Sequence, residues 1–98
     1  MTLYHESFTL AAATPKIIAT IPAGNPLTHV SVTNVNAVAI FLGDATVSAT
    51  GSADRGVKVA SEGTREIWLN AGDTLYAVSA AGTGSSHDVA VVYSKVVG

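Results

Sequence analysis

Three histidines are the side chains in this sequence best suited to bind a metal ion. His5, His29 and His87 are spread along the chain, and none lies two or four residues from another histidine or a carboxylate in a recognised ligand spacing. Asp88 follows His87 directly, but neighbouring residues on a strand point to opposite faces. We therefore expect the histidines to be structural or exposed, and we predict no metal site.

The carboxylates and hydroxyls also lack the spacing of catalytic residues. Asp44, Asp73 and Asp88 lie near glycines or serines, where aspartate commonly accepts hydrogen bonds from turn amides. No serine occupies a G-x-S-x-G elbow, and the chain has no cysteine to act as a nucleophile. The glycines are scattered and form no phosphate-binding loop before a helix. We predict that the protein is not an enzyme and uses no cofactor.

The stretch from Gly63 to Gly82 contains two aromatic residues that belong either to the core or to a binding surface. Its two apolar runs flank residues 70–73, Asn-Ala-Gly-Asp, and this pattern predicts a β-hairpin. Trp68 and Tyr76 lie about equally far before and after the turn, so a hairpin would place them near each other on facing strands. Such a pair either covers the core or forms an exposed platform for a sugar or a protein.

Alternation of apolar and polar residues predicts strands along the whole chain. Besides the two arms of the hairpin, the expected strands are 2–12, 16–21, 27–35, 37–42, a short one around 46–48, 57–59 and 88–97. No helix is required. We predict an all-β fold: one domain over residues 1–98, an antiparallel β-sandwich of about eight short strands, compatible with a jelly roll.

Composition and charge exclude several classes of protein. Of the 98 residues 48% are hydrophobic and 12% charged, and the formal net charge is −2. A nucleic-acid-binding protein would show a basic stripe, and a membrane-spanning helix would need about 18 consecutive apolar residues. Neither pattern occurs, and the N-terminus lacks a secretion signal. We expect no nucleic-acid partner, no membrane insertion, and synthesis in a reducing cytoplasm.

About half of the chain, from Val30 to Thr83, resembles small β-sandwich virion proteins of tailed bacteriophages. The shared pattern consists of strand ends, turns and apolar strands in a fixed order. Its positions in this sequence are Asn34, Leu42-Gly43, Val47, Gly56, Val57 to Val59, Glu62-Gly63 and Ala71 to Ala77.

The resemblance implies a structural role without turnover, most like that of a capsid decoration protein. Such a protein binds the assembled head shell and stabilises it by bridging capsid subunits. The implied partners are the major capsid protein of the same phage and further copies of this chain, with a trimer favoured. The implied location is the outer surface of the head, after synthesis in the host cytoplasm. The alternatives are a neck, tail or head-fibre accessory protein, and a carbohydrate-binding module that uses Trp68 and Tyr76.

Apolar residues beyond the needs of a small sandwich indicate where a partner would bind. The first strand carries Tyr4 and Phe8, and the run 37–42 is apolar throughout. Trp68 alternates with aliphatic residues, so both faces of its strand are partly apolar. The predicted contact residues are Tyr4, Phe8, Ile40, Phe41 and Trp68.

Overall fold

Residues with period-two alternation form strands that have one buried face. In the strand Thr28–Asn34, Val30 and Val32 are fully buried, whereas His29 between Thr28 and Val30 is exposed. The computed structural model describes residues 2–10, 14–35, 38–47, 56–79 and 89–95. Within these ranges it contains eight strands and no helix.

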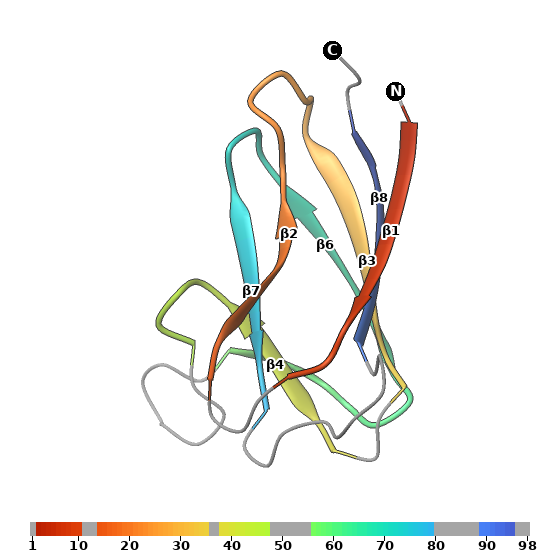
Figure 1. Cartoon of the computed structure of the whole chain (residues 1–98), viewed down its shortest axis with the longest axis vertical. Helices are drawn as coiled ribbons and strands as arrows, with labels where there is room; N and C mark the ends of the chain where they lie inside the picture. Colours follow the sequence, from red (N-terminus) through yellow and green to blue (C-terminus); the bar gives the residue numbers. More distant parts are fainter. Residues whose placement is uncertain (1, 11–13, 36–37, 48–55, 80–88, 96–98) are drawn as a thin grey trace.

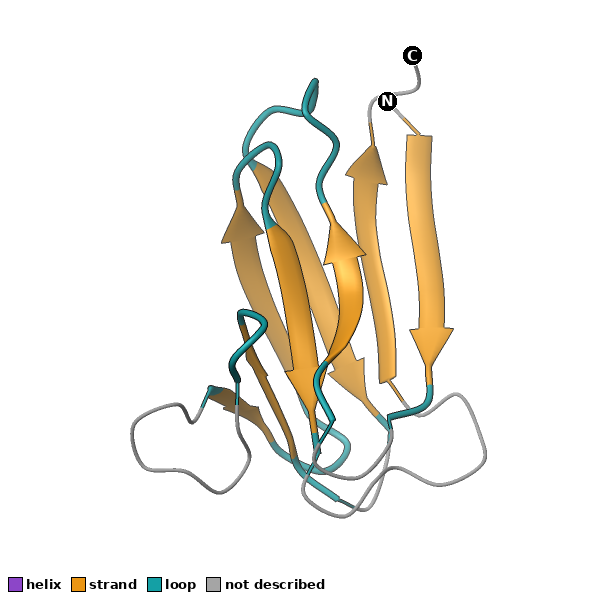
Figure 2. Cartoon of the chain, turned by 60° about the vertical axis from the view of Figure 1, so that its left-hand side comes forward, coloured by secondary structure: helices purple, strands orange, loops and turns teal. Residues whose placement is uncertain are grey.

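The strands stand in two layers of four (Figure 2). Their bounds are β1 (Thr2–Phe8), β2 (Lys16–Thr20), β3 (Thr28–Asn34), β4 (Ile40–Gly43), β5 (Val57–Val59), β6 (Thr64–Leu69), β7 (Thr74–Val78) and β8 (Val89–Lys95). One sheet has the order β1-β8-β3-β6, and the other has the order β2-β7-β4-β5. All of the paired strands are antiparallel.

The pairing follows one nested pattern, which is that of a jelly roll. The strand β1 pairs with β8, β2 with β7, β3 with β6, and β4 with β5, so the first half of the chain lies along the second half in reverse. Contacts of β3 with β8 and of β4 with β7 join these pairs into sheets (Figure 1). The predicted antiparallel β-sandwich is confirmed, and its strand order is that of a jelly roll.

The core lies between the two sheets and consists mainly of aliphatic side chains. Burial of this apolar surface is the main favourable term that offsets the entropy of ordering the chain. The largest fully buried apolar side chains are Leu10, Ile18, Ile21, Ile40, Leu42, Val30, Val32, Val59, Val78, Val89 and Val91. Leu10 lies beyond the end of β1, so the first strand contributes to the core through the residues that follow it as well.

The predicted hairpin over residues 63–82 is wrong, because β6 and β7 belong to different sheets. The turn between them does form: the Asp73 amide donates to the Asn70 carbonyl, and Gly72 has a φ of 84°. The chain uses this turn to cross from one sheet to the other, and the Gly72 amide then donates to the carbonyl of Ile21. Trp68 consequently pairs with His29 of β3, not with Tyr76.

Three other expectations on strands also need correction. No strand forms at 46–47, where the Val47 amide closes a turn on the carbonyl of Asp44, and Ser48 lies outside the described residues. The run expected at 37–42 becomes a strand only from Ile40 onward within its described part. A register shift between Ile17 and Ala19 interrupts alternation in β2, so Ile17 is exposed while the next two residues are buried.

Candidate functional site

The five predicted contact residues lie in four different places of the fold. Tyr4 and Phe8 are half-buried on β1 and pack against the core from its open edge. Ile40 is fully buried in the core, so its side chain offers no surface to a partner. Phe41 is half-buried on β4, and Trp68 is 61% exposed on β6, in the other sheet. The structure brings together only Tyr4 and Phe8.

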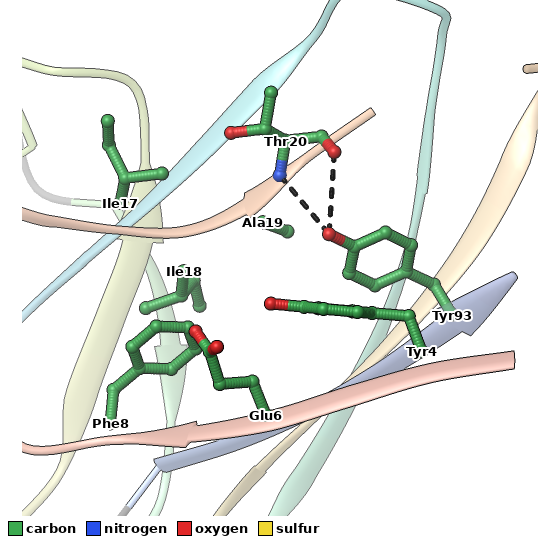
Figure 3. Close-up of a pocket in the computed structure, with 8 residues that line it drawn as sticks. All are labelled: Tyr4, Glu6, Phe8, Ile17, Ile18, Ala19, Thr20 and Tyr93. Carbon is green, nitrogen blue, oxygen red and sulfur yellow. Dashed lines mark hydrogen bonds between the residues drawn. The ribbon is translucent and has the colours of Figure 1, made fainter. Parts of the chain in front are cut away.

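These two residues line a pocket of about 180 Å³ at the open seam of the sandwich. The strand β1 is the edge of one sheet and β2 is the edge of the other, so no backbone ladder closes the seam between them. The pocket walls come from β1, β2 and the end of β8 (Figure 3). The lining residues are Tyr4, Glu6, Phe8, Ile17, Ile18, Ala19, Thr20 and Tyr93.

Two tyrosines form the end of the pocket and connect its two sides. The ring centroids of Tyr4 and Tyr93 are 5.0 Å apart and the rings are tilted by 53°, a favourable aromatic arrangement. They are direct partners in the register of β1 and β8. The Tyr93 hydroxyl lies 3.4 Å from both the amide nitrogen and the carbonyl oxygen of Thr20, and so reaches from β8 across to β2.

Burial and the charge of Glu6 both raise the pKa values of the two tyrosines in the pocket. Burial, followed by a hydrogen bond with Glu6 and its negative charge, raises the pKa of Tyr4. Burial also raises the pKa of Tyr93; the hydrogen bond with Thr20 opposes this effect, and the charge of Glu6 adds to it. Both phenols are therefore neutral at physiological pH, and Glu6 is the one charged residue among those that line the pocket.

A second candidate surface is the outer face of the sheet β1-β8-β3-β6. His5, Val92, Ser31 and Glu66 form one row across its four strands. Two positions further along each strand, toward the same end of the sheet, lie Leu3 on β1, His29 on β3 and Trp68 on β6. These three residues therefore belong to the adjacent row on the same face. Leu3 is 68% exposed and Trp68 is 61% exposed.

His29 holds Trp68 in place on this face. The two ring centroids are 4.8 Å apart, with an angle of 44° between the ring planes. The Nε2 atom of His29 also lies 2.6 Å from the Oε1 atom of Glu66, which is two residues before Trp68 on β6. An exposed indole that is supported in this way loses little conformational entropy when a ligand stacks on it.

The predicted turn roles of the aspartates are confirmed where the structure describes them. The Thr46 amide and hydroxyl donate to Asp44 Oδ1 at 2.9 Å and 2.7 Å. These two hydrogen bonds, the hydroxyl first, lower the pKa of Asp44. The Asn70 amide donates to Asp73 Oδ2 at 2.7 Å. Asp88 and His87 lie outside the described residues.

The other chemistry-bearing side chains are not gathered into a reactive cluster in the described part of the chain. His5 lies on the outer face of β1 and His29 contacts Trp68 and Glu66. Across the described ranges, no three His, Asp or Glu side chains lie close enough together to hold a metal ion. These same ranges contain no helix of the length and apolarity needed to cross a lipid bilayer.

Sequence reasoning missed Glu6, Tyr93 and His29 as members of these two surfaces. The alternation in the first strand does place Glu6 on the side of Tyr4 and Phe8, which was the available signal for the pocket. Tyr93 and His29 join their partners only through long-range strand pairing, for which the sequence contains no local signal.

Comparison with models of protein families, with curated proteins and with solved structures found no significant match to this chain. The strand order defines a small all-β sandwich of two sheets with jelly-roll connectivity.

Proposed function

We propose that this chain is a non-enzymatic structural protein of a tailed-bacteriophage virion, most like a capsid decoration protein. In this role it binds the outer surface of the assembled head and bridges neighbouring capsid subunits. The observation that carries the proposal is a jelly-roll sandwich whose outer sheet face displays Leu3 and Trp68 in one row. These two side chains stand on the edge strands β1 and β6 of that face, where a partner protein that spans the sheet could bury both of them.

Repetition makes modest contacts sufficient for this role. The partners are the major capsid protein and further copies of this chain, with a trimer favoured. A symmetric oligomer that contacts several capsid subunits at once converts later contacts into intramolecular ones, which multiplies its apparent affinity. The stabilisation of the shell then comes from buried surface and needs no reaction at any side chain.

The location of the protein in the virion tests this role. Cryo-electron microscopy of virions of the source phage is expected to show the jelly roll repeated over the outer surface of the head. A single ring at the neck, or copies only along the tail or a fibre, would contradict the decoration role and favour an accessory protein with the same fold.

Trp68 supports a second candidate function, the binding of carbohydrate. Its indole is exposed and rests on His29, and a flat supported ring suits stacking on a sugar. Tyr76 takes no part, because β7 belongs to the other sheet. Trp68 is the single tryptophan of the chain, so its fluorescence reports on this site alone. A saturable change on titration with host polysaccharide would favour this function, and a flat titration would remove it.

A further inference from the structure

The seam pocket between β1 and β2 combines aromatic walls with one carboxylate. Tyr4, Phe8 and Tyr93 contribute three rings, and Glu6 contributes the negative charge. Ring faces attract cations through the quadrupole of the π system, and a carboxylate attracts them by charge. Glu6 and the half-buried rings of Tyr4 and Phe8 therefore favour the same kind of ligand atom, one that carries a positive charge, while the buried Tyr93 packs behind Tyr4.

The arrangement of these groups suits a cation on an aliphatic stem. In Figure 3 the Tyr4 hydroxyl and the Glu6 carboxylate point toward the space between the strands, and Ile18 lies beside the Phe8 ring. The apolar lining residues from β2 are Ile17, Ile18 and Ala19. A methylene chain can pack on this apolar side while its charged head stays near Glu6 and water.

The protein already contains one contact of this type at the edge of the pocket. The Nζ atom of Lys16 lies 6.0 Å from the centroid of the Phe8 ring, at the outer limit of a cation–π contact. Lys16 is not among the residues that line the pocket. The rings of Tyr4 and Tyr93 and the carboxylate of Glu6 lie farther along the seam, toward the end of β8.

We propose that the seam pocket binds a basic side chain presented by a protein partner, with arginine preferred. A guanidinium group can stack on a tyrosine ring and donate to the Glu6 carboxylate at the same time, whereas an ammonium group is a compact and more strongly hydrated charge. An acidic side chain is repelled by Glu6, and a purely apolar one desolvates that carboxylate without compensation. This inference does not depend on the proposed virion role.

Titration of the isotope-labelled protein with N-acetyl-arginine amide tests the pocket directly. We expect saturable changes in the aromatic NMR signals of Tyr4, Phe8 and Tyr93, and smaller ones with N-acetyl-lysine amide. N-acetyl-norleucine amide, which has an apolar stem and no charge, should cause no saturable change. Binding of the arginine probe should weaken when salt is raised to about 0.5 M, because the charges are only partly buried.

Two matched substitutions separate the pocket from general charge effects. Glu6→Gln should weaken the arginine probe about fivefold or more, since it removes the charge but keeps the shape. Glu66→Gln makes the same change on β6, at the opposite edge of the sheet, and should leave binding unchanged. Equal binding of norleucine and arginine, no effect of salt or of Glu6→Gln, or no binding at all would each overturn the proposal.

Discussion

The buried side-chain amide of Asn34 connects the end of β3 to two other backbone segments. Its Nδ2 atom lies 2.8 Å from the carbonyl oxygen of Val38, 3.3 Å from that of Val59 and 3.4 Å from that of Ala60. Asn34 is fully buried, and so is its contact with Val59, whereas its contacts with Val38 and Ala60 are partly buried. A buried carbonyl that loses its donor pays the cost of desolvation without compensation.

We therefore predict that Asn34→Ala lowers the free energy of unfolding by about 1–3 kcal/mol. Asn70→Ala is the matched control, because Asn70 is exposed and should change stability by less than about 0.5 kcal/mol. Urea unfolding of both variants measures the difference. Equal stability of the two variants would contradict the role assigned to the buried amide.

The raised pKa values of Tyr4 and Tyr93 make stability fall at alkaline pH. Both folded-state values lie above the value of about 10 for an unfolded tyrosine. The stability that these two protonated phenols give to the folded state is fully present below the unfolded pKa. It is lost as pH rises through the folded pKa, because the unfolded chain releases these protons first.

Urea unfolding between about pH 9 and pH 11.5 should therefore show declining stability. The decline should be shallower in Tyr93→Phe, which has one phenol fewer to ionise in the pocket. Other groups titrate in both proteins, so the difference between the two slopes of stability against pH reports on Tyr93. An identical slope in both proteins would show that the Tyr93 phenol is not shifted by its surroundings.

At the scale of elements, the crossing from β6 to β7 depends on Gly72. Its φ of 84° is a left-handed conformation that costs a residue with a Cβ about 1–2 kcal/mol. No atom lies within 4 Å of a Cβ built at this position, so backbone strain alone opposes a side chain.

Gly72→Ala should thus lower the free energy of unfolding by about 1–2 kcal/mol. Gly24 also has open space around it but no positive φ, so Gly24→Ala should be neutral or slightly stabilising. Thermal unfolding of the pair measures the contrast. Similar losses of stability at both positions would contradict a left-handed conformation at Gly72.

Most strand positions were predictable from the sequence, because alternation is a local property that follows from burial of one face; residues 46–47, which form a turn, are an exception. The pairing of one strand with another was not predictable in the same way. The residues Asn70 to Asp73 form a tight turn whether the next strand pairs with the previous one or crosses to another sheet. The register shift in β2 was also invisible, since a bulge changes which side chain faces inward without any change in composition.

The candidate pocket was predictable only on its β1 side. Period-two alternation places Tyr4, Glu6 and Phe8 on one face of the first strand. The contact between Tyr93 and Thr20 joins residues that are 73 positions apart, and only the pairing of whole strands brings them together. The burial of Ile40 could not be predicted either, because the sequence does not distinguish an apolar residue in the core from one on a docking surface.

At the scale of the whole molecule, nested pairing makes β1 part of the framework. It covers the edge of β8, and the residues after it place Leu10 in the core at 2% exposure. We therefore expect removal of residues 1–14 to disrupt folding, so that loss of binding in such a variant would not report on docking. Point substitutions at exposed positions, such as Leu3→Ser and Trp68→Ser, change the surface and leave the core intact.

Binding to expanded heads tests most directly whether this molecule works by docking. The proposed role requires a phage that encodes this chain; heads of that phage prepared without the protein are incubated with increasing amounts of the purified chain and sedimented. We expect saturation at a fixed ratio to capsid subunits, and weaker uptake of the double variant Leu3→Ser, Trp68→Ser. Failure of the unchanged protein to sediment with heads, or uptake that never saturates, would contradict a decoration role.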